Sequence, residues 1–301
     1  MASAWRCRKA PHHADQNTNL IYYPAAPAGT VVPFQPQEVS GDYLLSLQTS
    51  YVTSFFVADL FNGGLPSLVT LSSSQNQVAV NSLNDPTVPN GSSSPYFQQY
   101  QVAASPVQGV AADINGDGAL DVVIAHNDTT GAGVGVGVLV NTFVPIDGAV
   151  NPSGNQVWTL PEARYSIGHP VSNVAVGDLN GDGKPDIVAV TADGTNLIIL
   201  LLNDGTGNFV QGATVQAGMG ASQVALCDFN QDGILDIAVL NTGDATIGIF
   251  RGNGDGTFQT MEPYSVGANP TAFTVPRVPC LDRGFPQMAP CRPCRSIPSL
   301  T

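Results

Sequence analysis

Acidic and amide side chains recur in one nine-residue pattern at three places in this 301-residue chain. The pattern is Asp-x-Asn-x-Asp-Gly-x-x-Asp, in which positions 1, 3, 5 and 9 carry side-chain oxygens and position 7 offers its backbone carbonyl. Calcium prefers about six to eight such hard oxygen ligands, and glycine at position 6 permits the sharp turn that gathers them. The residues predicted to hold about three calcium ions are Asp113, Asn115, Asp117, Ala119 and Asp121 in the first loop, Asp178, Asn180, Asp182, Lys184 and Asp186 in the second, and Asp228, Asn230, Asp232, Ile234 and Asp236 in the third.

Two other interpretations of this pattern are an EF-hand and an ordinary turn. An EF-hand begins similarly but needs a bidentate acid at position 12 and an exiting helix, whereas position 12 here is Ile124, Ala189 or Val239, within an apolar run. Asp, Asn and Gly also dominate ordinary turns for reasons unrelated to metals. Three copies with the same donors at the same positions favour a calcium loop between two strands. Clustered aspartates repel one another without a cation, so we expect calcium to stabilise the fold.

The elements that must position these loops are short strands. Apolar, β-branched runs flank each loop, such as 174–176 before the second and 187–190 after it. Counting a fainter copy at Asp59, the first aspartates lie at 59, 113, 178 and 228, which are 54, 65 and 50 residues apart. Each unit predicts four strands, the content of one propeller blade. With 32 Gly and 23 Pro, long helices are disfavoured, so the predicted fold class is all-β.

The first and last copies are incomplete. After Asp59, Phe61 and Gly63 replace the second and third ligand positions. A fifth copy begins at 267–275, but Arg277 stands 49 residues after Asp228, where the next aspartate is due. The sequence therefore predicts a propeller of about four blades with open edges, and open edges favour self-association.

The three aspartate loops, together with the Gly-x-Gly-x-Phe-like turns at 203–209 and 252–258, resemble the FG-GAP/VCBS repeats of integrin-α-like β-propellers. The resemblance covers roughly 41–275. It implies a seven-bladed propeller with calcium loops between the first two strands of some blades. It also implies an extracellular or cell-surface setting and binding of protein or carbohydrate partners through loops on one face.

Composition changes at both ends of the chain. We expect residues 1–40 to be an irregular segment, 41–276 to hold the propeller repeats, and 277–301 to be an irregular tail rich in Pro, Cys and Arg. A fragment or a shifted reading frame explains the interrupted fifth repeat better than a natural extension does. No apolar region typical of a secretory signal follows the N-terminal charges.

The charge distribution restricts the partners. The formal charge is −13, and between residues 10 and 276 only Arg164, Lys184 and Arg251 are basic. An acidic body repels phosphate backbones, so nucleic-acid binding is not expected. No stretch reaches the roughly 18 apolar residues of a membrane helix. Three calcium ions would add six charges and change −13 to −7.

The remaining reactive residues do not predict an enzyme. His126 and His169 are expected in loops without a catalytic partner, and Cys227 has no evident disulfide partner. The pair at 291–294 lacks the further ligands of a zinc site. We therefore expect a calcium-binding, non-catalytic extracellular recognition or adhesion module. The alternative is the propeller appendage of a secreted hydrolase or lyase whose catalytic part is absent.

Overall fold

The computed structural model describes residues 52–60, 67–82, 97–130, 135–141 and 161–275. The chain divides into two units, Met1–Ser50 and Tyr51–Thr301, and the described residues all belong to the second. The predicted N-terminal segment 1–40 and the tail 277–301 lie outside them. Phe61 and Gly63, the substituted positions of the first copy, lie outside them as well.

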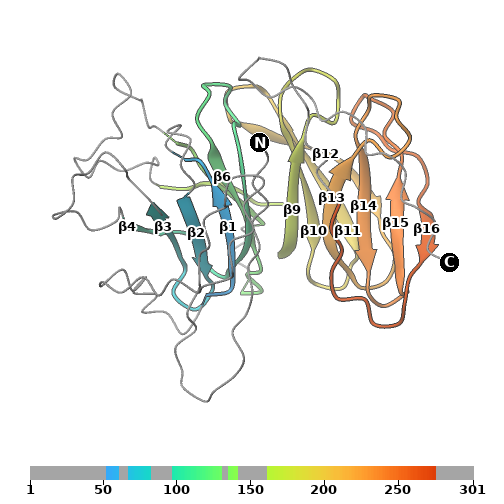
Figure 1. Ribbon diagram of the computed structural model, residues 1–301, viewed down its shortest axis with the longest axis horizontal. Helices are drawn as coiled ribbons and strands as arrows, with labels where there is room; N and C mark the ends of the chain where they lie inside the picture. Colours follow the sequence, from blue (N-terminus) through green and yellow to red (C-terminus); the bar gives the residue numbers. More distant parts are fainter. Residues whose placement is uncertain (1–51, 61–66, 83–96, 131–134, 142–160, 276–301) are drawn as a thin grey trace, which may run out of the picture. The chain divides into compact units, whose positions relative to one another are not determined.

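The described residues form strands and turns, with no helix among them, and the strands make four antiparallel sheets of four (Figure 1). We number these sheets as blades 1 to 4 in chain order. Blade 1 contains β1 (Ser54–Ala58), β2 (Ser67–Ser72), β3 (Gln77–Ser82) and β4 (Phe97–Gln101); blade 2 contains β5 (Pro106–Ala112), β6 (Asp121–His126), β7 (Val136–Leu139) and β8 (Ala163–Tyr165); blade 3 contains β9 (Val171–Gly177), β10 (Asp186–Thr191), β11 (Leu197–Asn203) and β12 (Phe209–Gln216); and blade 4 contains β13 (Ala221–Cys227), β14 (Asp236–Asn241), β15 (Thr246–Phe250) and β16 (Glu262–Ser265).

In every blade the strands pair in chain order, each with the next. This is the blade of a β-propeller, so the all-β, four-stranded-blade prediction is confirmed. The described sheets do not close into a ring, in agreement with the prediction of a partial propeller.

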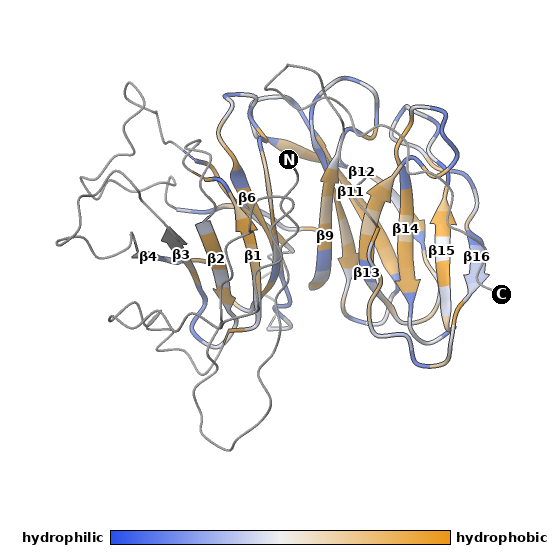
Figure 2. Cartoon of the chain, in the orientation of Figure 1, coloured by the Kyte–Doolittle hydropathy of each residue, from blue (hydrophilic) through white to orange (hydrophobic). Residues whose placement is uncertain are grey.

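The second strand of each blade is buried along its whole length. Its residues alternate between two cores: in β10, Ile187 and Ala189 lie in a core shared with blade 2, whereas Val188 and Val190 lie in one shared with blade 4. Both faces of the strand are therefore apolar, which explains the continuous hydrophobic runs in the sequence. Figure 2 shows the apolar residues along the strands and the polar ones concentrated in the connections.

Side-chain amides join the first strands of successive blades. Gln108 Oε1 accepts a hydrogen bond from Val174 N at 2.9 Å, and Asn173 Oδ1 accepts one from Val224 N at 3.1 Å. Gln223 Oε1 accepts the same bond from Phe273 N at 2.9 Å. The predicted fifth copy thus continues this series at Phe273, although residues 271–275 do not form a strand.

Antiparallel pairing places the connections at two opposite edges of each blade. One edge carries the loop between the first and second strands and the turn between the third and fourth; we call it the loop edge. The other carries the turn between the second and third strands and the link to the next blade; we call it the linker edge. The predicted calcium loops 113–121, 178–186 and 228–236 all lie at the loop edges of their blades.

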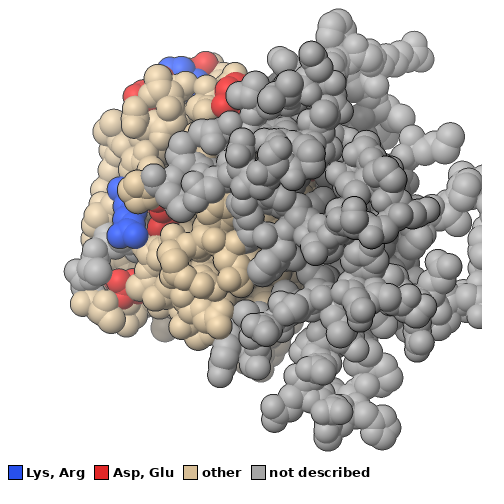
Figure 3. All heavy atoms as spheres, turned by 90° about the vertical axis from the view of Figure 1, so that its left-hand side faces the viewer, with Lys and Arg blue, Asp and Glu red and all other residues tan. Residues whose placement is uncertain are grey.

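The described part of the chain contains no helix long and apolar enough to cross a membrane. On the face drawn in Figure 3, the described surface is mostly uncharged, with a few acidic and basic side chains.

Candidate calcium loops

The aspartate at position 1 organises each predicted calcium loop. In the first loop, Asp113 Oδ1 accepts a hydrogen bond from Gly116 N at 2.8 Å, and its Oδ2 accepts one from Gly118 N at 2.9 Å. The same two bonds recur at 2.8 and 2.9 Å from Gly181 and Gly183 to Asp178, and at 2.6 and 2.9 Å from Gln231 and Gly233 to Asp228. The three loops therefore share one fold around this carboxylate.

Positions 3 and 5 continue the same arrangement. The Oδ1 atom of Asn115 accepts a hydrogen bond from Asp117 N at 3.0 Å, and the Oδ1 atom of Asp117 accepts one from Ala119 N at 2.8 Å. Both bonds recur in the other loops, in Asn180, Asp182 and Lys184 and in Asn230, Asp232 and Ile234. Backbone N–H groups thus orient the side chains at positions 1, 3 and 5 within each loop.

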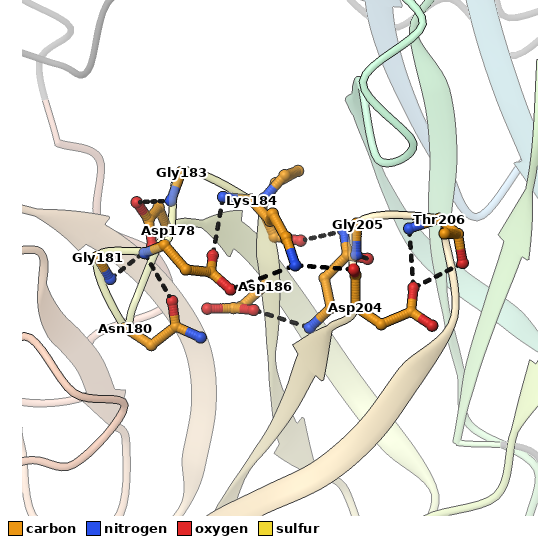
Figure 4. Close-up of polar contacts among 12 residues, drawn as sticks. Asp178, Asn180, Gly181, Gly183, Lys184, Asp186, Asp204, Gly205 and Thr206 are labelled. Atoms are coloured by element: carbon orange, nitrogen blue, oxygen red, sulfur yellow. Dashed lines mark hydrogen bonds and ion pairs between the residues drawn. The ribbon is translucent and has the colours of Figure 1, made fainter.

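The second loop also holds a cation from the protein (Figure 4). Lys184 Nζ lies 3.8 Å from Asp182 Oδ2 and donates a hydrogen bond to the backbone oxygen of Asp204 at 2.8 Å. Asp204 belongs to the turn between the third and fourth strands of the same blade. This lysine therefore ties the loop to the neighbouring turn and partly neutralises it.

The loop fold requires left-handed backbone conformations at positions 4 and 6. Position 4 has φ of 75° at Gly116 and 76° at Gly181, and position 6 is glycine in every loop. The third loop has Gln231 at position 4 with φ of 66°. A side chain is strained in this region whereas glycine is not, so the third loop is the least relaxed of the three.

The aspartate at position 9 lies inside the blade rather than in the exposed loop. Asp121 is 0% exposed; its Oδ2 accepts from Ile114 N at 2.8 Å and its Oδ1 from Asn141 N at 2.6 Å. The equivalent bonds join Asp186 to Leu179 and Asn203, and Asp236 to Phe229 and Gly252, at 2.9 to 3.0 Å. Position 9 therefore fixes the start of the loop and the end of the third strand.

Burial, and to a smaller extent neighbouring carboxylates, disfavours the charged form of the position-9 aspartate in the first two loops. Burial raises the pKa of Asp121 to about 6, and the negative charges of Asp117 and Asp113 raise it as well, against the lowering by its two N–H bonds. Burial and the neighbouring Asp182 and Asp178 likewise raise the pKa of Asp186. A cation beside these carboxylates would relieve both effects.

The donor set fits calcium in its chemistry, since each loop offers three carboxylates, one amide oxygen and one backbone carbonyl. The arrangement is not a preformed cluster: within the described residues no three His, Cys, Asp or Glu side chains are grouped closely enough to hold a metal ion. The carboxylates at positions 1 and 5 accept bonds from their own loop, and position 9 accepts bonds inside the blade. The fifteen ligand assignments therefore remain predictions.

Sequence reasoning missed two residues that connect the blades. Asn141 and Asn203 follow or end the third strands of blades 2 and 3, and they are 1% and 4% exposed. Asn141 Nδ2 donates to the backbone oxygen of Leu60 at 2.8 Å, and Asn203 Nδ2 donates to that of Ile114 at 2.7 Å. Their common place in the repeat, 20 and 17 residues after the position-9 aspartate, is the signal that could have identified them.

The expectation that His126 lies in a loop is wrong. His126 ends β6 with 0% exposure, and its Nε2 lies 2.7 Å from Glu162 Oε1. Its Nδ1 donates to the backbone oxygen of Ala104 at 3.0 Å, and Glu162 Oε2 accepts from Ala103 N at 2.7 Å. Gly137 in β7 makes room for this pair, because a Cβ there would collide with the Glu162 carboxylate. The partner was hidden from sequence because it lies 36 residues away.

Cys227 also differs from expectation. It ends β13, is 4% exposed, and is disulfide-bonded. Every other cysteine of the chain lies outside the described residues.

His169, at the linker edge, pairs with Asp193 at 2.7 Å, so it is a loop residue as predicted but has an acidic partner. Although desolvation raises the pKa of Asp193, hydrogen bonds from His169 and Thr195 lower it to about 2.

A family model for the FG-GAP-like repeat matches residues 178–239 and 228–277, which include the second and third loops. A comparison with curated protein sequences gives no match.

Solved structures with similar folds include BBS1N in complex with ARL6DN, in crystals soaked with lead (15% identity, TM-score 0.44) or mercury (15%, 0.45). Another is an Agrocybe aegerita lectin described as recognising non-reducing terminal N-acetylglucosamine (18%, 0.44). The matches cover 73%, 74% and 72% of this chain and 58%, 59% and 54% of those chains, respectively. The chain thus spans little more than half the length of these structures.

Proposed function

Because the chain is an FG-GAP-like repeat protein, we propose that it is a calcium-binding, non-catalytic recognition module. One observation carries this proposal: three loops at equivalent edges of three blades have the same oxygen donors and the same internal hydrogen bonds. Turn preference alone explains a single Asp-Asn-Gly loop. It does not explain a repeated arrangement of four side-chain donors.

In this proposal the ion supplies positive charge to each loop. The position-1 aspartates, of which Asp113 and Asp178 are partly exposed and Asp228 is 3% exposed, would bind from the loop, while Asp121 and its equivalents would bind from inside the blade. The side chains at positions 3 and 5 would complete the set with the carbonyl at position 7. The chain's own N–H groups orient these carboxylates, and binding would draw them closer together, because within the described residues they are not grouped as a metal cluster.

The polar clusters of the described residues suit support better than catalysis. His126 and Glu162 are both 0% exposed through their side chains, so substrate does not reach them. The loop aspartates are engaged by backbone N–H groups that hold them in place. We infer that recognition uses the rigid loop edge, with a protein or carbohydrate partner, because loops on a rigid scaffold are the usual place for binding residues.

The disulfide at Cys227 supports an extracellular setting for this module. Disulfides persist in oxidising compartments and are rare in reducing ones. Millimolar calcium is also available outside cells, which suits loops of exposed carboxylates. Localisation of the tagged natural protein tests this inference; a reduced Cys227 in protein isolated from its native cells would contradict it.

Calorimetric titration with calcium tests the central proposal. We expect about three sites, and a rise in unfolding free energy of about 2.7 kcal/mol for each site at a hundredfold excess of calcium over Kd. Chelator should remove this gain in a thermal melt. The loss variant replaces Asp117, Asp182 and Asp232, the position-5 ligands, with Asn.

The matched control replaces Asp204 and Asp255, aspartates in turns of the same edge, with Asn. Each of these carboxylates caps its own turn through a threonine, so this variant should bind calcium normally. Absence of binding heat in the unmodified protein, or equal binding by the position-5 variant, would refute the assignment. Glycan-array and pull-down experiments with and without calcium would then identify the partner class.

A further inference from the structure

Asn203 joins the second calcium loop to the first. Its backbone N–H donates to Asp186 Oδ1 at 2.9 Å, so its position depends on the last ligand of the second loop. Its Nδ2 donates to the backbone oxygen of Ile114 at 2.7 Å, at position 2 of the first loop in the neighbouring blade. A second bond from Nδ2 to Pro185 O at 2.9 Å holds the amide in this orientation.

The connection continues through the first loop. Ile114 N donates to Asp121 Oδ2 at 2.8 Å, so the residue that Asn203 holds also orients the last ligand of the first loop. The carboxylates of Asp186 and Asp121 are therefore linked by three consecutive hydrogen bonds through Asn203 and Ile114. All four residues are buried, and a polar group that loses its partner in such surroundings costs about 1–3 kcal/mol. The link will therefore resist opening.

The third loop lacks this link. Gly252 stands in blade 4 where Asn203 stands in blade 3: its N–H donates to Asp236 Oδ1 at 3.0 Å, but it has no amide side chain. A Cβ at Gly252 would collide with the backbone oxygen of Leu235. The second and third loops are joined instead by a bond from Gly256 N to Leu179 O at 3.1 Å, from within the turn at 252–258.

We propose that Asn203 couples calcium binding in the first and second loops, so that an ion in either loop strengthens binding in the other. This inference rests on the proposed function. An ion in either loop draws in Asp186 or Asp121, and because the link resists opening, Asn203 and Ile114 carry this displacement to the last ligand of the other loop. The third loop, joined only through a turn, binds more independently.

Charge does not oppose this coupling. The first and third loops each carry three aspartates and a formal charge of −3 when empty, which one calcium ion changes to −1; Lys184 makes the second loop −2 when empty and 0 with one ion. Filling one loop therefore reduces the repulsion between neighbouring loops and does not create two positive sites. Coupling between sites is typically about 5- to 150-fold in affinity, and we expect the lower part of this range for a single shared side chain.

NMR titration of the full chain tests this proposal loop by loop. The amides of Gly118, Gly183 and Gly233 each donate to the position-1 carboxylate of their own loop, so their shifts report occupancy separately. In the unmodified protein, Gly118 and Gly183 should titrate together with a Hill coefficient above one, and Gly233 along its own curve. Asp182→Asn should weaken binding at Gly118 about fivefold.

Asn203→Gly gives blade 3 the glycine that blade 4 has at Gly252. It should abolish the joint titration of Gly118 and Gly183 and the effect of Asp182→Asn on Gly118. Asn203→Asp, which keeps the shape but not the donor, serves if the glycine variant fails to fold. Asn208→Gly, in the same turn but bonded only to Thr206 and Asp204, is the matched control and should leave the coupling unchanged. Persistent coupling in the Asn203 variants, or independent titration in the unmodified protein, would overturn the inference. No shift at any of the three glycines would instead refute calcium binding itself.

Discussion

Blades 2 and 4 have the same strand order but different chemistry where the second strand meets the linker edge. Blade 2 places His126 there, paired with Glu162 across Gly137. Blade 4 places Asn241 at the equivalent position, beside Met261 and Gly248, and its Oδ1 accepts from Gly218 N at 3.1 Å. In both blades the polar group holds the segment that arrives from the preceding blade.

The difference shows which part of this arrangement the fold requires. In both blades a side-chain oxygen accepts a hydrogen bond from one backbone N–H of the incoming segment. The donor is Ala103 N in blade 2 and Gly218 N in blade 4. Only blade 2 uses two ionisable groups for this purpose, and both are fully buried. Removing one partner of such a buried pair strongly destabilises a protein, whereas replacing both partners together by well-packed residues changes the stability little. Four predictions test this comparison.

Replacing Glu162 with Met, the residue of blade 4, is expected to have the largest effect. It leaves the ring of His126 and the N–H of Ala103 without their acceptor, so the unfolding free energy should fall by about 3–5 kcal/mol. Adding His126→Asn to Glu162→Met gives blade 2 the pair found in blade 4, and the unfolding free energy of the double variant should fall by less than about 1.5 kcal/mol. Urea unfolding measures both. If the double variant loses as much unfolding free energy as the two single changes added together, blade 2 cannot use the Asn and Met pair of blade 4.

The next largest difference between the two blades is expected from replacing a glycine of the third strand with alanine, which should lower the unfolding free energy more in blade 2 than in blade 4. At Gly137, a Cβ meets the Glu162 carboxylate and His126 Nε2, which are held by buried hydrogen bonds. At Gly248, a Cβ meets Sδ and Cγ of Met261, a flexible side chain, and comes within 3.1 Å of Asn241 Nδ2. We expect Gly137→Ala to cost about 2–3 kcal/mol and Gly248→Ala about 1 kcal/mol. Equal losses in thermal melts would mean that the charged pair can move aside.

The same contrast explains what sequence could predict. Loops and strands repeat at fixed spacing, so the aspartate pattern and the apolar runs around 122–125 and 187–190 identified the blades and their second strands. The buried partners follow no repeat: Glu162 is reached only across β7, after a connection that includes residues 142–160. A local pattern therefore placed His126 in a loop, because nothing near it in sequence indicates an acidic partner.

The calcium loops illustrate a second limit. Donor types and spacing were readable, and the three loops do share one hydrogen-bonding arrangement. The burial of Asp121, Asp186 and Asp236 was not readable, because it depends on the third strand of the same blade folding back over the loop. Asn141 and Asn203 were overlooked for the same reason, since their role depends on the neighbouring blade.

Exchanging the position-4 residues of the first and third loops should have a smaller, reciprocal effect. Gln231 has φ of 66°, and Gly116 has φ of 75°. Gln231→Gly should raise the unfolding free energy by about 1 kcal/mol by removing left-handed strain, and Gly116→Gln should lower it by a similar amount. Calorimetric melts in chelator measure the backbone effect without the ion. Changes of the same sign in both variants would contradict the strain assigned to the third loop.

The exposed ion pair of blade 4 should have the smallest effect. Arg251 Nη2 lies 3.2 Å from Glu262 Oε2, and both side chains are more than a third exposed, at 37% and 46%. The hydrogen bond from Arg251 holds the pKa of Glu262 below its usual value, so any stabilisation is present above about pH 4.5 and declines as the pH falls below it. Salt screens such a pair, and exposed pairs contribute little. Arg251→Gln should therefore leave the urea midpoint unchanged at 0.5 M salt and near neutral pH, whereas a loss as large as that of Glu162→Met would remove the distinction between the buried pair of blade 2 and the exposed pair of blade 4.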